Sequence, residues 1–152
     1  MSDDRFEVRS TGWRGEALLP AVRASLEEHF AEDLGDVRLH AGRFAGWLCR
    51  RLGAGAMAFG RRIYFSPAGW RRYRQAGPAG VALAAHEAVH VLQYRRDGLV
   101  RMLTRYLWQY VRGRLRGLGH TRAYRAIDYE REAFAVEADV RRRLSDAGNA
   151  TR

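Results

Sequence analysis

The sequence contains an H-E-x-x-H motif at residues 86–90, made by His86, Glu87 and His90. Residues four apart in an α-helix lie about 40° apart around its axis, so both imidazoles project from one face. Two neutral imidazoles are typical Zn²⁺ ligands, and a catalytic site adds one protein ligand and keeps a position for water. The motif therefore predicts Zn²⁺ bound by His86 and His90, with Glu87 as the general base of a hydrolase.

The third ligand must come from another part of the chain. The metzincin pattern places a third histidine six residues after the second, but position 96 is Arg96. A carboxylate from a later helix is the alternative, and Glu130 and Glu132 stand in the first turn of the last expected helix. On a helix these two side chains point about 160° apart, so they cannot both bind one ion. We favour Glu130 over Glu132; general acidity at a helix N-terminus is the competing explanation.

The motif lies in a strong helix candidate at 79–96, which Asp97-Gly98 ends. Apolar residues occupy the face opposite the histidines: Val81, Ala84, Ala88, Val91 and Leu92. We expect this face to pack on a core and hold the two histidines rigidly.

The remaining patterns predict an α+β fold in a single domain over residues 1–152, with a core at about 16–145. A short strand at 37–40 and a hairpin at 56–65, with Gly60 and Arg61 at its turn, supply a small antiparallel or mixed sheet. Further helices are expected at 16–34 (with Pro20 near its start and Gly35 as its stop), 42–52, 99–118 and about 129–144. The order is helix, strand, helix, hairpin and three helices.

Periodicity also assigns apolar residues to the expected helices. Helix 42–52 carries Phe44, Trp47, Leu48 and Leu52 on one side. In helix 99–118 the apolar stripe is Leu99, Met102, Leu103, Tyr106, Leu107, Tyr110, Val111 and Leu115. We therefore interpret Tyr106 and Tyr110 as core residues, and the four tryptophans (13, 47, 70 and 108) as core or edge residues.

Arginine accounts for all 27 basic residues, and the formal net charge is +10. This surplus favours acidic partners such as nucleic acid, anionic lipid or acidic protein segments, although the nucleotide composition of the source genome also explains such a bias. Five arginines lie along helix 99–118: Arg101, Arg105, Arg112, Arg114 and Arg116. Residues 70–74 interleave aromatic and basic side chains. Binding of nucleic acid or another anionic partner is thus an alternative function.

The N-terminus, MSDDRFEVRS, lacks the apolar segment of a secretory signal, and no window approaches 18 consecutive apolar residues. We expect a cytoplasmic protein without a transmembrane segment, with export by a route that reads no such signal left open. The single cysteine, Cys49, fits a reducing compartment. Its helical context predicts a small buried apolar residue and not a nucleophile.

Three segments together suggest a family: V-R-L-H-A-G at 37–42, G-R-R-I-Y-F-S-P at 60–67 and A-A-H-E-A-V-H-V-L-Q-Y at 84–94. The third is similar to a family helix reading H-E-x-x-H-x-x-Q. In this combination the chain resembles the DUF4157 family of zincin-like metallopeptidase domains, which also occurs in proteins associated with extracellular contractile injection systems. The resemblance implies a zincin-like fold and zinc-dependent peptidase activity.

The segment Y-E-R-E-A-F-A at 129–135 is similar to the E-R-x-A-D element of gluzincins, whose first Glu is the zinc ligand. The resemblance implies that Glu130 is this ligand. Where that element has an Asp that orients a ligating histidine, this chain has Phe134. Asp139, Glu137 or a backbone carbonyl could orient the histidine instead.

The leading hypothesis is a zinc-dependent metallopeptidase that hydrolyses peptide bonds of a protein or peptide substrate. The candidates for stabilising the developing oxyanion are His120, Tyr94, Tyr124 and Tyr129. The departure at Phe134 motivates a second hypothesis, a catalytically weak or inactive binding module on a zincin scaffold.

Overall fold

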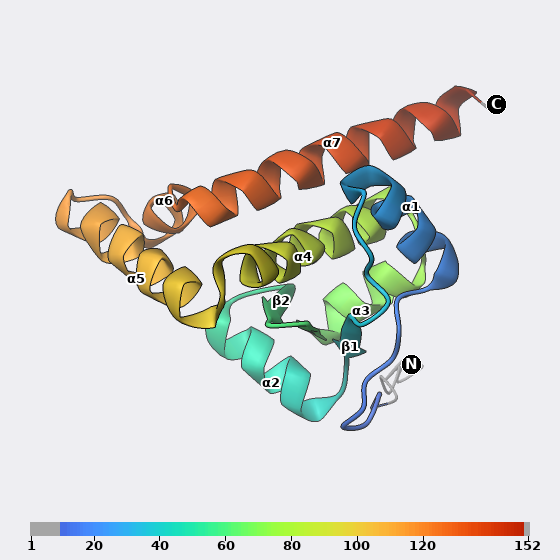
Figure 1. The fold of residues 1–152 in the computed structure, drawn as a ribbon, viewed down its shortest axis with the longest axis horizontal. Helices are drawn as coiled ribbons and strands as arrows, with labels where there is room; N and C mark the ends of the chain where they lie inside the picture. The colour runs from blue at the N-terminus through green and yellow to red at the C-terminus, as the bar shows by residue number, and fades with distance from the viewer. Residues whose placement is uncertain (1–9, 151–152) are drawn as a thin grey trace, which may run out of the picture.

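The computed structural model describes residues 10–150, and in this part of the chain it contains seven helices and one three-stranded sheet. In chain order the elements are α1 (Pro20–Phe30), β1 (Arg38–His40), α2 (Arg43–Leu52), β2 (Ala56–Phe59), β3 (Arg62–Phe65), α3 (Pro67–Arg74), α4 (Pro78–Asp97), α5 (Leu99–Leu115), α6 (His120–Arg125) and α7 (Asp128–Ala150). The predicted α+β class is confirmed, with helices predominating (Figure 1).

The sheet is mixed and has the order β1-β3-β2. β2 and β3 form the predicted hairpin, with Ala58 opposite Ile63, and Gly60 turns the chain at a φ of 59°. β1 runs parallel to β3, with Leu39 beside Ile63. Both Leu39 and Ile63 are fully buried, so the alternation in these short strands directs their apolar side chains into the core.

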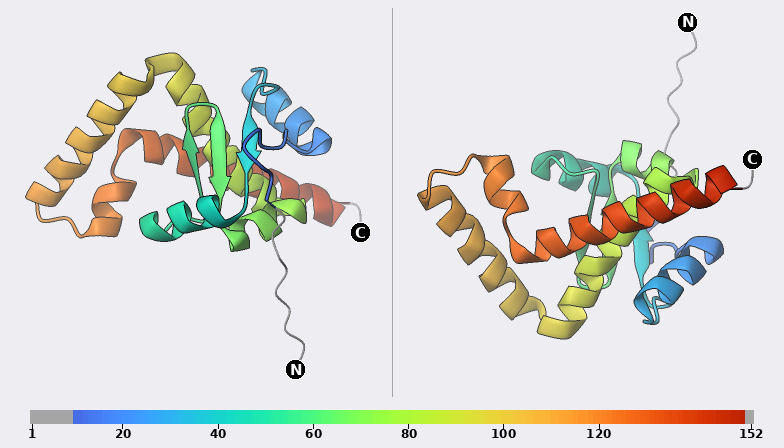
Figure 2. Two further views of the ribbon diagram at one scale, coloured as in Figure 1. Left: turned by 90° about the horizontal axis from the view of Figure 1, so that it is seen from below. Right: turned by 90° about the horizontal axis from the view of Figure 1, so that it is seen from above.

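α4 passes through the middle of the fold, with the sheet on one side and α7 on the other (Figures 1 and 2). Its predicted apolar face is in place, since Val81, Ala84, Ala88 and Val91 are all buried. At Gly80, a Cβ atom would collide with the carbonyl oxygen of Arg72. Glycine there allows α3 to cross closely over the first turn of α4.

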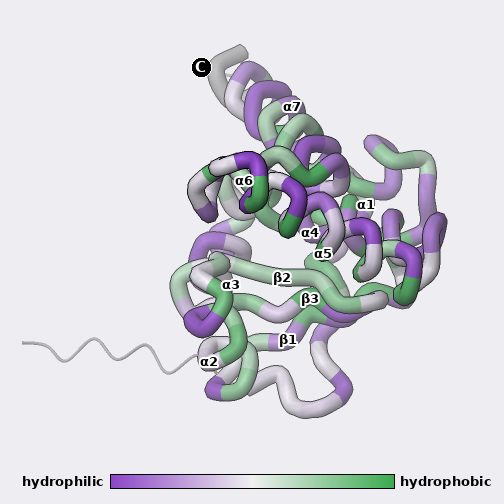
Figure 3. The backbone as a smooth tube through the Cα atoms, turned by 90° about the vertical axis from the view of Figure 1, so that its left-hand side faces the viewer, coloured by the Kyte–Doolittle hydropathy of each residue, from purple (hydrophilic) through white to green (hydrophobic). Residues whose placement is uncertain are grey.

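Two apolar clusters hold the elements together. The larger one joins α1, the sheet, α3 and α4, and includes Leu26, Leu39 and Phe65. The smaller one consists of Met102, Ile127 and Tyr129, against which Tyr94, Tyr106 and Tyr110 pack. Figure 3 shows apolar residues along β2 and β3, whereas hydrophilic and apolar residues alternate along α5. The smaller cluster anchors the inner side of α5 and the start of α7.

The prediction of a helix over 16–34 is wrong at both ends, because α1 begins at Pro20 and stops at Phe30. Glu16 forms an isolated β-bridge with Leu39 instead. Ala31 takes a left-handed conformation, and the Glu27 carboxylate accepts the backbone N–H of Leu34 at 2.8 Å. This bond turns the chain so that Leu34 is buried, with 1% exposed.

Two short helices, α3 and α6, were not predicted. The Ser66-Pro67 pair directly follows the predicted hairpin. In the structure, the Ser66 hydroxyl accepts the Gly69 N–H at 3.0 Å, so the pair also caps and starts α3. A serine N-cap followed by proline is a recognised helix start, and that signal was present in the sequence.

The predicted apolar side of helix 42–52 is not the side through which α2 packs. Phe44, Trp47 and Leu52 are 64%, 49% and 58% exposed, whereas α2 packs through Ala45, Gly46 and Cys49. These small side chains let α2 lie close to β3, where the Cys49 thiol contacts the Tyr64 carbonyl oxygen at 3.4 Å.

The same correction applies to helix 99–118 and to the tryptophans. Within α5 only Met102 and Gly113 are buried, and the large aliphatic residues of the expected stripe face outwards. Trp70 lies in the core, but Trp13 and Trp108 are 78% and 59% exposed. No helix in residues 10–150 has the length and apolarity required to cross a bilayer.

The interpretation of Cys49 as a buried residue is confirmed, because its side chain is fully buried in α2. Burial raises the pKa of this thiol to about 11. We expect the folded protein to resist a disulfide reagent such as Ellman's reagent at pH 7.5, and the guanidinium-unfolded protein to react completely within minutes. Rapid reaction of the folded chain would contradict this packing of α2.

Candidate metal centre

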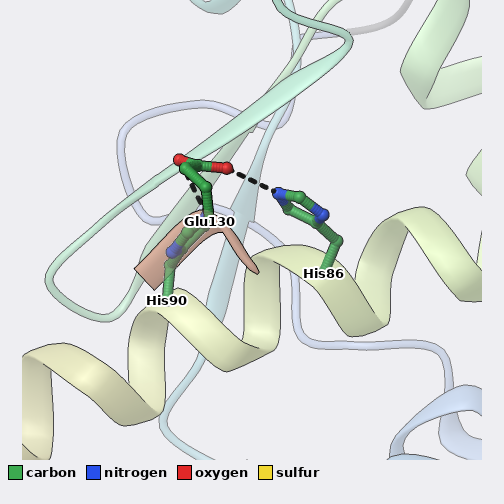
Figure 4. A group of neighbouring side chains, drawn as sticks. All are labelled: His86, His90 and Glu130. Atoms are coloured by element: carbon green, nitrogen blue, oxygen red, sulfur yellow. Dashed lines mark ion pairs between the residues drawn. The ribbon is translucent and has the colours of Figure 1, made fainter. Parts of the chain in front are cut away.

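His86 and His90 on α4 face Glu130, which lies in the first turn of α7 (Figure 4). His86 Nε2 is 3.4 Å from Glu130 Oε2, and His90 Nε2 is 3.4 Å from Glu130 Oε1. One ligand atom from each residue lies within 4.8 Å of the other two. The structure therefore brings together the three residues that the sequence singled out, in an arrangement that could hold a metal ion.

All three side chains are buried: His86, His90 and Glu130 are 5%, 7% and 3% exposed. Burying a carboxylate is costly unless cations or hydrogen-bond donors surround it. Glu130 Oε2 is nevertheless without a hydrogen-bond partner among residues 10–150. A buried, unsatisfied carboxylate oxygen beside two imidazole nitrogens fits a divalent cation that prefers mixed nitrogen and oxygen ligands, such as Zn²⁺.

The far side of each imidazole is held by a separate acceptor. His86 Nδ1 lies 3.0 Å from Glu137 Oε2, and His90 Nδ1 lies 2.8 Å from Gln93 Oε1. These acceptors favour the tautomer with a proton on Nδ1, which leaves Nε2 free to bind a cation. The two Nε2 atoms are those that face Glu130.

Glu137 fills the orienting role that Phe134 left open. It is one of the three groups that the sequence left as alternatives, and it lies two helical turns beyond Glu130 on the same face of α7. Asp139, another alternative, forms ion pairs with Arg142 and Arg143 instead. The Phe134 ring packs edge-on against His86, with 4.7 Å between the ring centroids.

Gln93 is itself fixed in orientation. Its Nε2 donates to the Tyr129 carbonyl at 3.0 Å and to Glu132 Oε2 at 2.9 Å, which turns its carbonyl oxygen towards His90. Glu132, the less favoured candidate ligand, therefore contacts Gln93 and not the two histidines, and it also pairs with Arg96. Because Glu130 and Glu132 point about 160° apart on α7, only Glu130 faces His86 and His90.

Tyr106 packs against the smaller apolar cluster, as its interpretation as a core residue implies, but it has a second role that the sequence analysis missed. Its hydroxyl donates to Glu130 Oε1 at 3.0 Å, so α5 contributes directly to the buried cluster. Burial and the Glu130 carboxylate both raise the pKa of Tyr106 and of its neighbour Tyr124. A buried tyrosine hydroxyl needs a polar partner, and that need was the available sequence signal for Tyr106.

Of the four oxyanion candidates, Tyr124 lies close enough to Glu130 for the two groups to shift each other's pKa. The Tyr129 hydroxyl donates to Asp97 at 2.9 Å. His120 Nδ1 forms an exposed hydrogen bond with the Tyr110 hydroxyl, which links α6 to α5. Tyr94 packs against Phe59 and hydrogen-bonds to none of the three clustered residues.

The charges of the cluster stabilise one another. Burial alone lowers the pKa of His86, but Glu130 and Glu137 outweigh it and raise this pKa to about 9. Burial alone raises the pKa of Glu130, but His86 and His90 outweigh it and hold the pKa well below its usual range. Without a metal, the cluster is thus a buried ion pair. A metal must displace these protons, so its affinity falls as pH falls.

Glu87, the predicted general base, is 4% exposed and lies at the junction of α4 with β2. Burial raises its pKa, against the opposing effects of His90 and His86. The backbone amide of Ala58 on the edge strand β2 also lowers this pKa, so it lies near the carboxylate. Glu87 Oε2 has no hydrogen-bond partner in the described part of the chain and is available.

Two antiparallel helices that bury a His-His-Glu group, beside a small mixed sheet, define a domain of α+β class with a side-chain cluster that could hold a metal ion. The chain belongs to the eCIS core domain family, whose model matches residues 17–98, more than half of the sequence. This family was formerly called DUF4157, so the resemblance noted from the sequence is confirmed at the level of the family. No curated protein and no solved structure matches the chain.

The family match covers only part of the candidate site. It ends at Gly98, so it includes α1 to α4 and with them His86, Glu87 and His90. Glu130 lies on α7, outside the matched residues. The assignment of Glu130 as a candidate ligand rests on the short gluzincin-like segment and on the geometry of the buried cluster.

The contact between His86 and Glu137 gives a direct prediction. Glu137→Gln is expected to weaken zinc binding roughly 10- to 100-fold, because the amide orients the imidazole less strongly than a carboxylate does. Competition titration with a chromophoric chelator measures the affinity. Asp139→Asn is the matched control, since Asp139 lies on the same helix but pairs only with arginines, and it should bind zinc as the wild type does. Equal affinity in all three proteins would exclude an orienting role for Glu137.

Proposed function

We propose that the protein is a zinc-dependent hydrolase that cleaves peptide bonds, with zinc held by His86, His90 and Glu130. The observation that supports this most strongly is the pair of unsatisfied buried carboxylate oxygens, on Glu130 and Glu87, beside two histidines whose Nδ1 atoms already have acceptors. One oxygen suits a cation and the other suits a proton. A purely structural metal site would not require a free carboxylate oxygen such as Glu87 Oε2.

When bound, a zinc ion lowers the pKa of a coordinated water and polarises a substrate carbonyl. Glu87 supplies the base: its unpartnered Oε2 accepts the proton of the attacking water and later delivers it to the leaving amine. Because burial raises the pKa of Glu87, its carboxylate is a better proton acceptor than an exposed glutamate.

Tyr124 is the residue we assign to the developing oxyanion. Its raised pKa keeps the hydroxyl protonated, so it is a hydrogen-bond donor throughout the reaction. Both hydroxyls lie near Glu130, and that of Tyr106 donates to this carboxylate at 3.0 Å and positions it. The two rings meet edge to face, with 6.5 Å between their centroids.

The alternative of a weak or inactive binding module was motivated by Phe134. Since Glu137 orients His86, that motivation is removed, and the peptidase is the better supported of the two proposals. The family name associates the domain with extracellular contractile injection systems. We therefore infer that the protein acts in, or alongside, such an assembly and that its substrate is a protein or peptide encountered there.

Metal content tests the ligand assignment. Protein dialysed against zinc and then against metal-free buffer should retain about one zinc per chain, because three protein ligands in a buried site bind far more tightly than scattered histidines. His86→Ala should lose this zinc, whereas His29→Ala, which removes a histidine on α1, should keep it. Elemental analysis measures the ratio, and equal zinc in both variants would refute the site.

Glu87→Gln tests the chemistry separately from the metal. Turnover of a fluorogenic peptide library is expected to fall roughly 10²- to 10⁴-fold, because the amide cannot accept a proton. Zinc content should stay at the wild-type level. Glu28→Gln, on the exposed side of α1, is the matched control and should retain full turnover. Undiminished turnover in Glu87→Gln would eliminate the proposed mechanism.

A further inference from the structure

α5 exposes an extensive apolar surface that its own fold does not cover. Its large outward side chains are 42% to 83% exposed: Leu99, Val100, Leu103, Leu107, Trp108, Val111 and Leu115. At 100° per residue these seven span about half of the helix circumference. We call them the α5 apolar face. Thr104 and Arg114 fall within the same half of the helix, so the face is mainly apolar but not uninterrupted. Single exposed apolar residues are ordinary, but seven on one side of a helix mark an interaction site.

Arginines border this face. Arg101, Arg105, Arg112 and Arg116 follow the α5 apolar face around the helix, before the buried side that carries Met102 and Tyr106. Residues 98–127 contain seven arginines and no Asp or Glu. Of these seven, only Arg105 forms a salt bridge within residues 10–150, to Asp128 at 3.1 Å. The border is therefore cationic and largely uncompensated.

The position of α5 leaves this surface accessible. The helix forms the outer edge of the molecule at the end opposite the C-terminus of α7 (Figures 1 and 2). Its 17 residues extend about 25 Å, at 1.5 Å per residue. Met102 and Tyr106 on its inner side attach it to the rest of the fold. An approaching planar surface can thus contact the whole length of α5.

We propose that α5 seats the domain on an anionic lipid bilayer, lying in the plane of the interface. An apolar face with a tryptophan and a cationic border is the composition of interfacial helices. The apolar side chains enter the boundary between headgroups and acyl chains, and the arginines contact the lipid phosphates. A nucleic acid would engage the arginines but would leave seven large apolar side chains in water.

This seating has a geometric consequence. Tyr106 lies on the inner side of α5 and donates to Glu130, so the buried His-His-Glu cluster would lie about one helix diameter, 10 Å, from the lipid surface. The proposal does not depend on catalysis, because it rests on exposure and charge alone.

Vesicle sedimentation of the full chain tests the proposal. Partitioning into vesicles of equal parts phosphatidylglycerol and phosphatidylcholine should be at least tenfold stronger than into phosphatidylcholine alone. Val100→Asp/Leu107→Asp should reduce it at least tenfold, since both positions are exposed and belong to the α5 apolar face. Phe44→Asp/Leu52→Asp is the matched control, with similar exposure on α2, and should partition as the wild type does.

Two further measurements keep the outcome decisive. Trp108 emission should shift to shorter wavelength on binding, and Trp108→Phe should lose that shift. If the aspartate pair on α5 fails to fold, Arg101→Gln/Arg112→Gln/Arg116→Gln tests the cationic border and should also lose at least tenfold in partitioning. Equal partitioning into both vesicle types, or unchanged partitioning of the α5 variants, would overturn the proposal. Binding to duplex DNA without vesicle binding would also overturn it and would assign the arginines to nucleic acid.

Discussion

The buried carboxylate of Glu130 imposes the constraint on which the rest of this structure depends. A carboxylate at 3% exposure must be surrounded by positive charge or hydrogen-bond donors, and His86, His90 and the Tyr106 hydroxyl supply them. These partners come from α4 and α5, while Glu130 itself comes from α7. These contacts to the Glu130 carboxylate fix α4, α5 and α7 relative to one another. A divalent cation between His86, His90 and Glu130 would neutralise the same carboxylate without moving these helices.

The topology follows from that requirement. α4 has to be buried on both sides, against the sheet on one and against α7 on the other, and it is accordingly rich in alanine and valine near the histidines. α5 and α6 carry the chain out and back, so that α7 returns antiparallel to α4. This return aligns Glu130 with His90 and Glu137 with His86. The edge strand β2 packs against α4, and its Ala58 amide lies near Glu87.

Patterns of local origin were readable from the sequence, and long-range contacts were not. Helical spacing placed His86 and His90 on one face, and the same rule separated Glu130 from Glu132. The hairpin and the limits of α4 followed from turn residues and periodicity. Periodicity groups apolar residues on one side of α2 and of α5 but does not tell whether that side is buried. In α2 small residues such as Ala45 and Gly46 pack closely, while Phe44, like Leu107 of α5, remains exposed. Tyr106 and Glu137 gained their roles only through contacts between distant segments.

The central claim is that His86, His90 and Glu130 bind one zinc ion together. A crystal of the zinc-loaded protein, measured with X-rays on either side of the zinc absorption edge, tests it most directly. The account predicts a single strong anomalous peak within bonding distance of His86 Nε2, His90 Nε2 and a Glu130 oxygen, with Glu137 still on His86 Nδ1. A peak bound by Glu132 instead, or no peak between α4 and α7, would contradict it.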